Sequence, residues 1–150
     1  MTEFILVIVA YLLGSIPTSV WISKSIFGID IRDYGSGNAG ATNTFRVLGS
    51  KWGSIVMIVD VLKGVIATSL YVLIPYYLTE ELARTNFMIV LGLTAVFGHV
   101  FPIWANFRGG KGVATLLGMA LAIQPTVAFL CIVVFLITLL STRFVSLSSM

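Results

Sequence analysis

The residues best suited to chemistry lie in two glycine-rich segments, and the first has the composition of an anion-binding loop. It reads Gly35-Ser36-Gly37-Asn38-Ala39-Gly40-Ala41-Thr42-Asn43 and is followed by Arg46. Glycines allow several backbone N–H groups to point at one spot, and hydroxyl, amide and guanidinium groups add further donors. We therefore expect a phosphate group to bind to Gly35, Ser36, Gly37, Asn38, Gly40, Thr42, Asn43 and Arg46.

The opening glycines also satisfy the G-x-G-x-x-G pattern of dinucleotide-binding folds, and Asp60 stands where that pattern expects an acidic residue. Those folds place the glycines between a buried strand and a helix. Here the preceding segment, 29–34, is short and interrupted by polar residues, and Asp60 sits inside a long apolar run. The context excludes a dinucleotide site and leaves an anion-binding loop.

The second segment, Phe107-Arg108-Gly109-Gly110-Lys111-Gly112-Val113-Ala114-Thr115, surrounds a lysine with glycines. It lacks the spacing of a P-loop, because Ala105 stands where the first glycine belongs and a glycine follows the lysine. An apolar helix beginning near Val113 would still offer free N–H groups and its positive dipole end to an anion. The second candidate phosphate site thus consists of Gly109, Gly110, Lys111 and Gly112.

Three ionisable residues lie within apolar runs. Asp60 and Lys63 are three residues apart and share one face of a helix. Each would cost about 2.5 to 3.5 kcal/mol if unpaired in hydrocarbon, so we expect them to pair, either as a structural ion pair or as part of a site. His99 lies near Pro102 and serves either packing or proton transfer.

Composition places the chain in a membrane. Of its 150 residues 58% are hydrophobic and only 10% charged, and the mean hydropathy is +1.04. Soluble domains are about 45 to 50% apolar and about 25% charged. The net charge of +3 comes from residues between the apolar runs, so we expect no nucleic-acid partner. The single cysteine, Cys131, is expected to pack among apolar groups.

The apolar runs predict an all-α integral membrane protein, a polytopic helical bundle in one domain over 1–150. About 20 residues of helix cross a bilayer. The run 113–142 forms either one long tilted helix or a hairpin broken at Gln124-Pro125, and we favour the hairpin because proline disfavours helix at the residue before it. The predicted helices, about five, are 4–23, 54–78, 87–107, 113–123 and 126–142.

Basic residues indicate how this bundle is oriented. Met1-Thr2-Glu3 lacks the basic start of a signal peptide, so we expect the first helix to remain in place. By the positive-inside rule the two glycine-rich loops face the cytoplasm and the N-terminus faces outside. The basic residues of these loops are Lys24, Arg32, Arg46, Lys51, Arg108 and Lys111.

Together these motifs resemble the bacterial acyl-phosphate-dependent glycerol-3-phosphate acyltransferases, the PlsY family. The resemblance rests on the two glycine-rich segments, with Arg46 after the first, and on Gly98-His99-x-Phe101-Pro102. Shorter matches extend it along the whole chain, at Gly14-Ser15-Ile16-Pro17-Thr18, Asp60-x-x-Lys63-Gly64 and Ser146-Leu147-x-Ser149.

The resemblance implies transfer of a fatty acyl group from acyl phosphate to the 1-hydroxyl of glycerol 3-phosphate, giving lysophosphatidic acid for phospholipid synthesis. It implies no cofactor, no metal, contact with membrane lipids, a bacterial cytoplasmic (inner) membrane location and a functional monomer. Family members have about seven helices. We therefore expect this chain to lack a C-terminal part with two more helices and a motif containing His and Asn.

Acyl phosphates are already activated, so we expect no acyl-enzyme, and the chain has no G-x-S-x-G elbow. Lys111 and Arg46 would neutralise phosphate charge, glycine N–H groups would bind the leaving phosphate, and Ser36 and Asn43 would orient the substrates. The hydroxyl proton goes to a substrate phosphate or to His99. The expected catalytic residues are Ser36, Arg46, His99 and Lys111, and Thr115 and Ser148 complete the substrate-binding set.

The alternative from another class is a transporter or channel for a phosphorylated small molecule. Anion-binding loops, broken helices and a buried charged pair would suit it as well. Transporters are commonly built from internal repeats, and neither glycine-rich segment recurs in the chain. We therefore prefer the enzyme.

Overall fold

The computed structural model describes residues 1–142, and this part of the chain is helical, without a β-strand. Three of its helical segments are long and apolar enough to cross a membrane, namely Thr2–Phe27, Ser50–Leu73 and Glu81–Ala105. The predicted all-α membrane fold is confirmed. The α-helices are α1 (Thr2–Gly14), α2 (Thr18–Phe27), α3 (Ala41–Leu48), α4 (Ser50–Thr68), α5 (Tyr76–Thr79), α6 (Glu81–Val100), α7 (Val113–Ile123) and α8 (Pro125–Thr142), and the 3-10 turns are η1 (Ile31–Asp33), η2 (Ser69–Leu73) and η3 (Ile103–Ala105).

The first apolar segment is broken in the middle, whereas the sequence analysis predicted one continuous helix over 4–23. Helix α1 ends at Gly14 and α2 begins at Thr18. Pro17 accounts for the break, because proline has no N–H group and disfavours helical backbone at the residue before it, Ile16. The prediction of an uninterrupted helix is wrong here.

The second predicted helix, 54–78, also has different limits. Helix α4 begins four residues earlier, at Ser50, and ends at Thr68. The chain then continues as the tighter turn η2 and, after Pro75, as the short helix α5. Proline lacks the N–H group that a longer helix would need at position 75.

Prolines also lie at the end of α6 and at the junction of α7 and α8. The third helix was predicted over 87–107, but α6 begins at Glu81 and ends at Val100, just before Phe101-Pro102. In the last apolar run α7 ends before Gln124 and α8 begins with Pro125. A proline is well suited to the first position of a helix, where no intrahelical N–H bond is needed.

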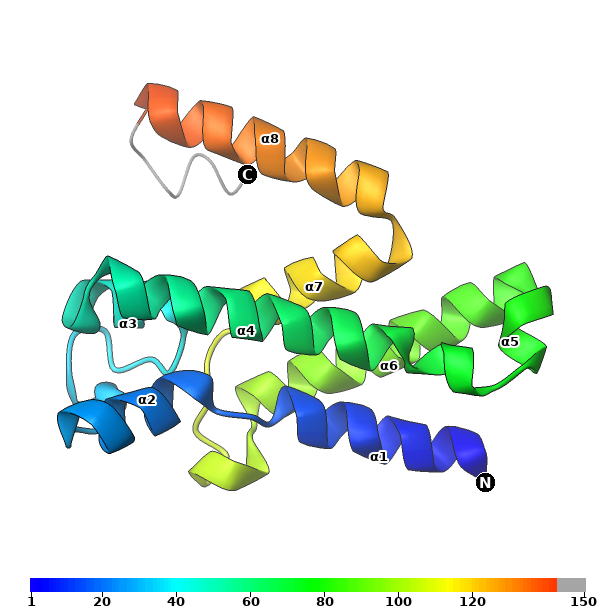
Figure 1. Ribbon diagram of the computed structural model, residues 1–150, viewed down its shortest axis with the longest axis horizontal. Helices are drawn as coiled ribbons and strands as arrows, with labels where there is room; N and C mark the ends of the chain where they lie inside the picture. Colours follow the sequence, from blue (N-terminus) through cyan, green and yellow to red (C-terminus); the bar gives the residue numbers. More distant parts are fainter. Residues whose placement is uncertain (143–150) are drawn as a thin grey trace.

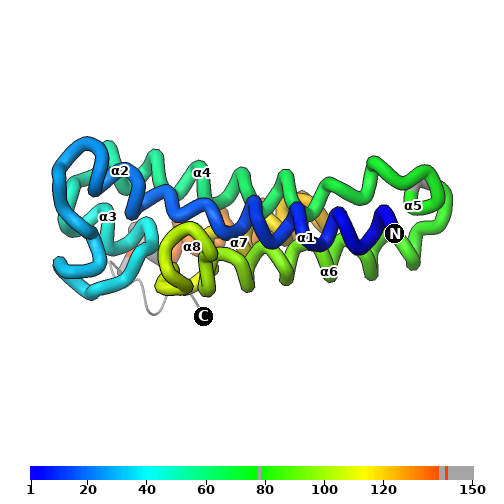
Figure 2. Tube along the Cα trace, turned by 90° about the horizontal axis from the view of Figure 1, so that it is seen from below, coloured from blue at the N-terminus to red at the C-terminus, as the bar shows by residue number. Residues whose placement is uncertain are grey.

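The helices run back and forth along one long axis, so the loops gather at two ends of the molecule (Figures 1 and 2). The N-terminus and α5 lie at one end. Helices α2 and α3, with the loop that joins them, lie at the other, and the loop from α6 into α7 returns toward them. We call this second region, formed by 28–40 and 101–112, the loop end, and both glycine-rich segments belong to it.

Glycines allow α4 and α7 to pack with their backbones in contact. A Cβ added at Gly64 of α4 would overlap the carbonyl oxygen of Thr115 in α7, and one added at Gly118 of α7 would overlap the carbonyl oxygen of Val61 in α4. Small residues favour such close approach in membranes, where lipid is as apolar as leucine and helices gain little from hydrophobic burial. The two helices therefore form one tightly joined pair.

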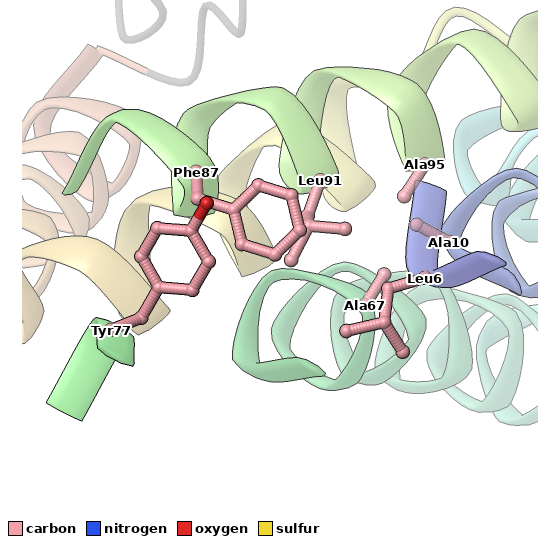
Figure 3. Packing of buried hydrophobic residues seen from close by; sticks show 7 residues of the cluster. All are labelled: Leu6, Ala10, Ala67, Tyr77, Phe87, Leu91 and Ala95. Carbon is pink, nitrogen blue, oxygen red and sulfur yellow. The ribbon is translucent and has the colours of Figure 1, made fainter. Parts of the chain in front are cut away.

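The larger cluster of buried apolar side chains joins helices α1, α4, α5 and α6 (Figure 3). There the rings of Tyr77 and Phe87 stack with their centroids 4.6 Å apart, and the Tyr77 hydroxyl donates a hydrogen bond of 2.6 Å to the Glu3 carboxylate. These contacts join α5 to α6 and α1. The cluster consists of Leu6, Ala10, Ala67, Tyr77, Phe87, Leu91 and Ala95.

The contact between α4 and α7 predicts the effect of enlarging Gly118. Gly118→Val should force the two helices apart and lower the free energy of unfolding by about 1 to 3 kcal/mol, the usual cost of overpacking. Thermal unfolding of the purified protein in detergent measures this. Leu116→Val, an exposed position on the same helix, is the control and should change little. Equal unfolding temperatures for the two variants would contradict the close backbone contact.

Candidate active site

The first glycine-rich loop is held in shape by Asn43, which lies in the first turn of α3. The buried Asn43 Oδ1 accepts a hydrogen bond of 2.8 Å from the Ser36 N–H group, and its Nδ2 donates to the carbonyl oxygens of Ile31 and Tyr34 at 3.1 and 3.0 Å. Gly35 has a φ of +63°, and a Cβ there would overlap the Asn43 side chain. Asn43 was expected to orient a substrate, and in the structure its side chain also shapes the loop that carries Ser36.

The polar residues that this loop exposes face one cavity. Thr42 and Arg46 are four residues apart on α3 and so share a face, and both are exposed, as is Ser36. Gly35 and Gly37, which were expected to contact phosphate, do not line the cavity, and their positive φ values show that they serve the turn. This loop and α3 contribute Ser36, Asn38, Gly40, Ala41, Thr42, Asn43 and Arg46 to the cavity.

The first two amides of the second glycine-rich loop already have acceptors within the protein. The N–H groups of Gly109 and Gly110 donate to the carbonyl oxygens of Val100 and His99, each at 3.2 Å. A Cβ added at Gly109 would overlap the His99 carbonyl oxygen, and one added at Gly110 would overlap the His99 ring. These glycines therefore let the loop pack against the end of α6, and their expected contacts with phosphate stay a prediction.

Lys111 follows these hydrogen bonds and is exposed at the start of α7. Gly112, with a φ of +78°, precedes the helix, and the N–H groups of its first turn have no intrahelical acceptor. Lys111, Gly112 and Val113 line the same cavity as Arg46. Within residues 1–142 neither Lys111 nor Arg46 forms an ion pair. Two cations and a helix N-terminus thus face one space.

Thr115 of the expected substrate-binding set does not line the cavity. Thr115 is fully buried between α7 and α4, and its hydroxyl has no hydrogen-bond partner in the described part of the chain. The helical period explains this position, because Ala114 takes the cavity face and Thr115 the face toward α4. Ser148 lies outside the described residues.

A buried group of charged side chains lies where α4 and α6 meet the break in the first span. Lys63 Nζ is 2.9 Å from Asp60 Oδ1 and donates a hydrogen bond of 2.9 Å to the Ile16 carbonyl oxygen. His99 Nδ1 is 3.6 Å from Asp60 Oδ1 and has no hydrogen-bond partner among the described residues. Asp60 and His99 line the cavity, whereas Lys63 does not. Lys63 therefore has a structural role in this ion pair, whereas Asp60 also belongs to the cavity.

The cavity has a polar end and an apolar wall. It measures about 1350 Å³ and extends from the two loops along α4, α7 and α8. A space of this kind suits a molecule with a charged head and a hydrocarbon tail. No cluster of three or more His, Cys, Asp or Glu side chains suited to a metal ion occurs in the described part of the chain. The apolar wall includes Met57, Ile58, Val61, Leu62, Leu117, Leu121, Leu130, Val134 and Phe135.

Arg32 connects the two loops, a role that the sequence analysis missed when it counted this residue only as a loop charge. Its Nε and Nη2 donate to the Asp30 carboxylate at 2.8 and 2.6 Å, and its Nη1 donates to the carbonyl oxygens of Ala105 and Arg108 at 2.8 and 3.2 Å. The Arg32 hydrogen bond holds the pKa of Asp30 well below its usual range. The Asp-x-Arg spacing is visible in the sequence, but the two distant carbonyl groups are not.

Comparison with known proteins relates the chain to one family. A family model described as glycerol-3-phosphate acyltransferase matches residues 4–150. The glycerol-3-phosphate acyltransferase of Listeria monocytogenes serotype 4a (strain HCC23) is 49% identical over 146 residues, which cover 97% of this chain and 71% of the relative. Glycerol-3-phosphate acyltransferase 2 of Bacillus cereus (strain ATCC 10987 / NRS 248) is 53% identical over 149 residues, covering 99% of this chain and 71% of the relative.

Two crystal structures share this fold. The integral membrane glycerol 3-phosphate acyltransferase PlsY (YgiH), in its glycerol 3-phosphate form, matches with a TM-score of 0.82 and 42% identity. The match covers 99% of this chain and 71% of that chain. The lysophosphatidic acid form matches with a TM-score of 0.78 and 40% identity, covering 99% and 70%.

The buried ion pair predicts a non-additive response to substitution. Asp60→Asn and Lys63→Met should each lower the free energy of unfolding by about 3 to 5 kcal/mol, because each leaves one uncompensated charge in the interior. The double variant leaves none and should be more stable than either single variant. Thermal unfolding in detergent measures all three. A double variant whose loss equals the sum of the single losses would contradict the pairing.

Proposed function

Because the chain belongs to the glycerol-3-phosphate acyltransferase family, we propose that it transfers a fatty acyl group from acyl phosphate to the 1-hydroxyl of glycerol 3-phosphate. The products are lysophosphatidic acid and inorganic phosphate. The observation that carries this proposal is the cavity, which joins two cationic loops to an apolar wall. Both substrates carry a phosphate group, and one also carries a hydrocarbon chain.

The reaction needs one bond to form and one to break. The 1-hydroxyl oxygen of glycerol 3-phosphate attacks the acyl carbon, the bond from that carbon to the phosphate oxygen breaks, and the electron pair leaves with the phosphate. Phosphate is a good leaving group, so the protein has to place the two substrates and stabilise charge. A positioned, water-poor site does both.

The exposed cations of the cavity are assigned to the phosphate groups. Lys111 and Arg46 neutralise phosphate charge, because both line the cavity and neither is paired with another described residue. Ser36 orients a substrate through its hydroxyl group. The first turn of α7, from Val113, offers its N–H groups and the positive end of the helix dipole to the leaving phosphate.

The proton of the attacking hydroxyl goes either to a substrate phosphate or to His99. His99 lines the cavity, and its Nδ1 lies 3.6 Å from the Asp60 carboxylate. A carboxylate beside one nitrogen favours a proton there and leaves the other ring nitrogen as the acceptor. No cofactor or metal is required by this scheme.

We assign the loop end to the cytoplasmic face of a bacterial inner membrane and the N-terminus to the outside. Arg32, Arg108 and Lys111 lie within the loop end, and Lys24 near the end of α2 and Lys51 at the start of α4 flank the first loop. The positive-inside rule places such loops in the cytoplasm. Glycerol 3-phosphate is then taken from the cytoplasm, and the acyl chain from the lipid phase. We propose that the complete protein works as a monomer with about seven helices.

Removing either cation tests the site. Lys111→Met and Arg46→Met should each slow acyl transfer by roughly 30-fold to 1000-fold, equal to about 2 to 4 kcal/mol of transition-state stabilisation. Gly110→Val should be as damaging without a change of charge, because its Cβ would overlap His99. Initial rates in detergent, normalised to inserted protein, measure this. Near-native rates for all three variants would exclude the loops as the substrate site.

The donor is tested by direct comparison of acyl phosphate with acyl-CoA. With glycerol 3-phosphate as the acceptor, the complete protein in liposomes should release inorganic phosphate and lysophosphatidic acid in equal amounts, without added metal. Acyl-CoA should be a poor donor, because the sequence has no recognisable adenine pocket. A preference for acyl-CoA would overturn the donor assignment.

Single cysteines test the orientation in a Cys131→Ser background. Cysteines placed at Gly37 and at Arg108, two residues before Gly110, should react with a membrane-impermeant reagent only from the cytoplasmic side. A cysteine at Glu81, at the opposite end of the molecule, should react only from outside. Labelling of Gly37 from outside would reverse the assigned orientation.

A further inference from the structure

The Arg32 side chain contacts both loops, and Asp30 holds its guanidinium group in place. The Asp30 carboxylate also accepts a hydrogen bond of 3.1 Å from the Arg32 N–H group and forms an ion pair of 3.0 Å with Lys24. With both carboxylate oxygens engaged, Asp30 holds the plane of the guanidinium group through two parallel hydrogen bonds. Nη1 is then directed at the segment that leads into the second glycine-rich loop.

The two carbonyl groups that accept hydrogen bonds from Arg32 lie at the ends of a turn whose backbone angles are unfavourable. Nη1 donates to the carbonyl oxygens of Ala105 and Arg108, and between them stand Asn106 and Phe107 with φ values of 54° and 57°. Positive φ is uncommon outside glycine, above all for a bulky aromatic residue, and persists only where the surrounding structure holds it. Arg32 binds both ends of this turn.

The turn leads directly into the residues that carry the lysine. After Arg108 come Gly109 and Gly110, whose N–H groups are bonded to the end of α6, and then Lys111. The loop is therefore fixed on one side by α6 and on the other by Arg32. Arg32 itself does not line the cavity.

We propose that Arg32 is a positioning residue for the reaction, because it holds the 105–108 turn and thereby sets where Lys111 stands relative to Ser36 and Arg46. The proposal rests on the proposed function. It differs from a direct electrostatic role, since the charge of Arg32 is balanced by Asp30. What the reaction requires from Arg32 is its planar set of donors, which a lysine cannot reproduce.

The test compares Arg32→Lys and Arg32→Gln with the control Lys24→Gln. The control removes the other cation from Asp30 but leaves the 105–108 turn untouched, and Lys24 is exposed. With acyl phosphate and glycerol 3-phosphate, both Arg32 variants should lose kcat/KM on the order of 100-fold, the effect of misplacing a catalytic group by about 1 Å. Lys24→Gln should stay within about twofold of the parent.

Trypsin cleavage of the detergent-solubilised protein reports on the loop without any assay of activity. Both Arg32 variants should be cleaved faster after Arg108 and Lys111, with cleavage after Lys51 unchanged. Activity of Arg32→Lys within twofold of the parent would overturn the proposal, and so would lost activity without faster cleavage at these two sites. If Arg32→Gln does not insert, Arg32→Lys alone decides. A parent protein without acyl transfer would refute the proposed function, while the cleavage pattern would still decide whether Arg32 holds the loop.

Discussion

A membrane interior offers no water, so every buried charge and every unpaired carbonyl group needs a partner within the protein. Lys63 meets both needs at once, because its ammonium group pairs with Asp60 and donates to the Ile16 carbonyl oxygen at the break in the first span. Helix α4 is thereby tied to the point where α1 passes into α2. Asp60, held by this pair, faces His99 at the cavity. The contacts of Lys63 and Asp60 therefore determine where the polar end of the cavity lies.

The sequence was sufficient for the class of fold, and the two cations that it singled out, Lys111 and Arg46, line one cavity. Long apolar runs with charges only between them have few solutions other than a helical membrane bundle, and Pro125 marks the end of one helix and the start of the next. Lys111 was singled out because glycines surround it, and Arg46 because it follows the first glycine-rich segment. Pro17 was overlooked because a single proline in a long apolar run does not by itself decide between a kink and a break.

The roles of the hydrogen-bonding residues were harder to predict, since they depend on which partners the fold brings near. Asn43 looked like a free donor in the sequence, yet it uses its amide group on Ser36, Ile31 and Tyr34. Gly109 was expected to bind an anion, and its close approach to the His99 carbonyl oxygen was not foreseen. Any residue type can supply a backbone carbonyl group as an acceptor, so the sequence does not indicate which carbonyl group a side chain will bind. These hydrogen bonds are visible only in the three-dimensional structure.

Helix α8 forms one wall of the cavity but packs against α7 and against no other helix to a similar extent. Gln124, a single non-helical residue, joins it to α7. An 18-residue helix is about 27 Å long, so a rotation of one degree at this hinge moves its far end by about half an ångström. Among the described residues, the angle between α7 and α8 therefore affects the width of the apolar space. Hydrogen bonds from Asn43 and Arg32 hold the two loops at the charged end, so separate contacts shape the two ends of the cavity.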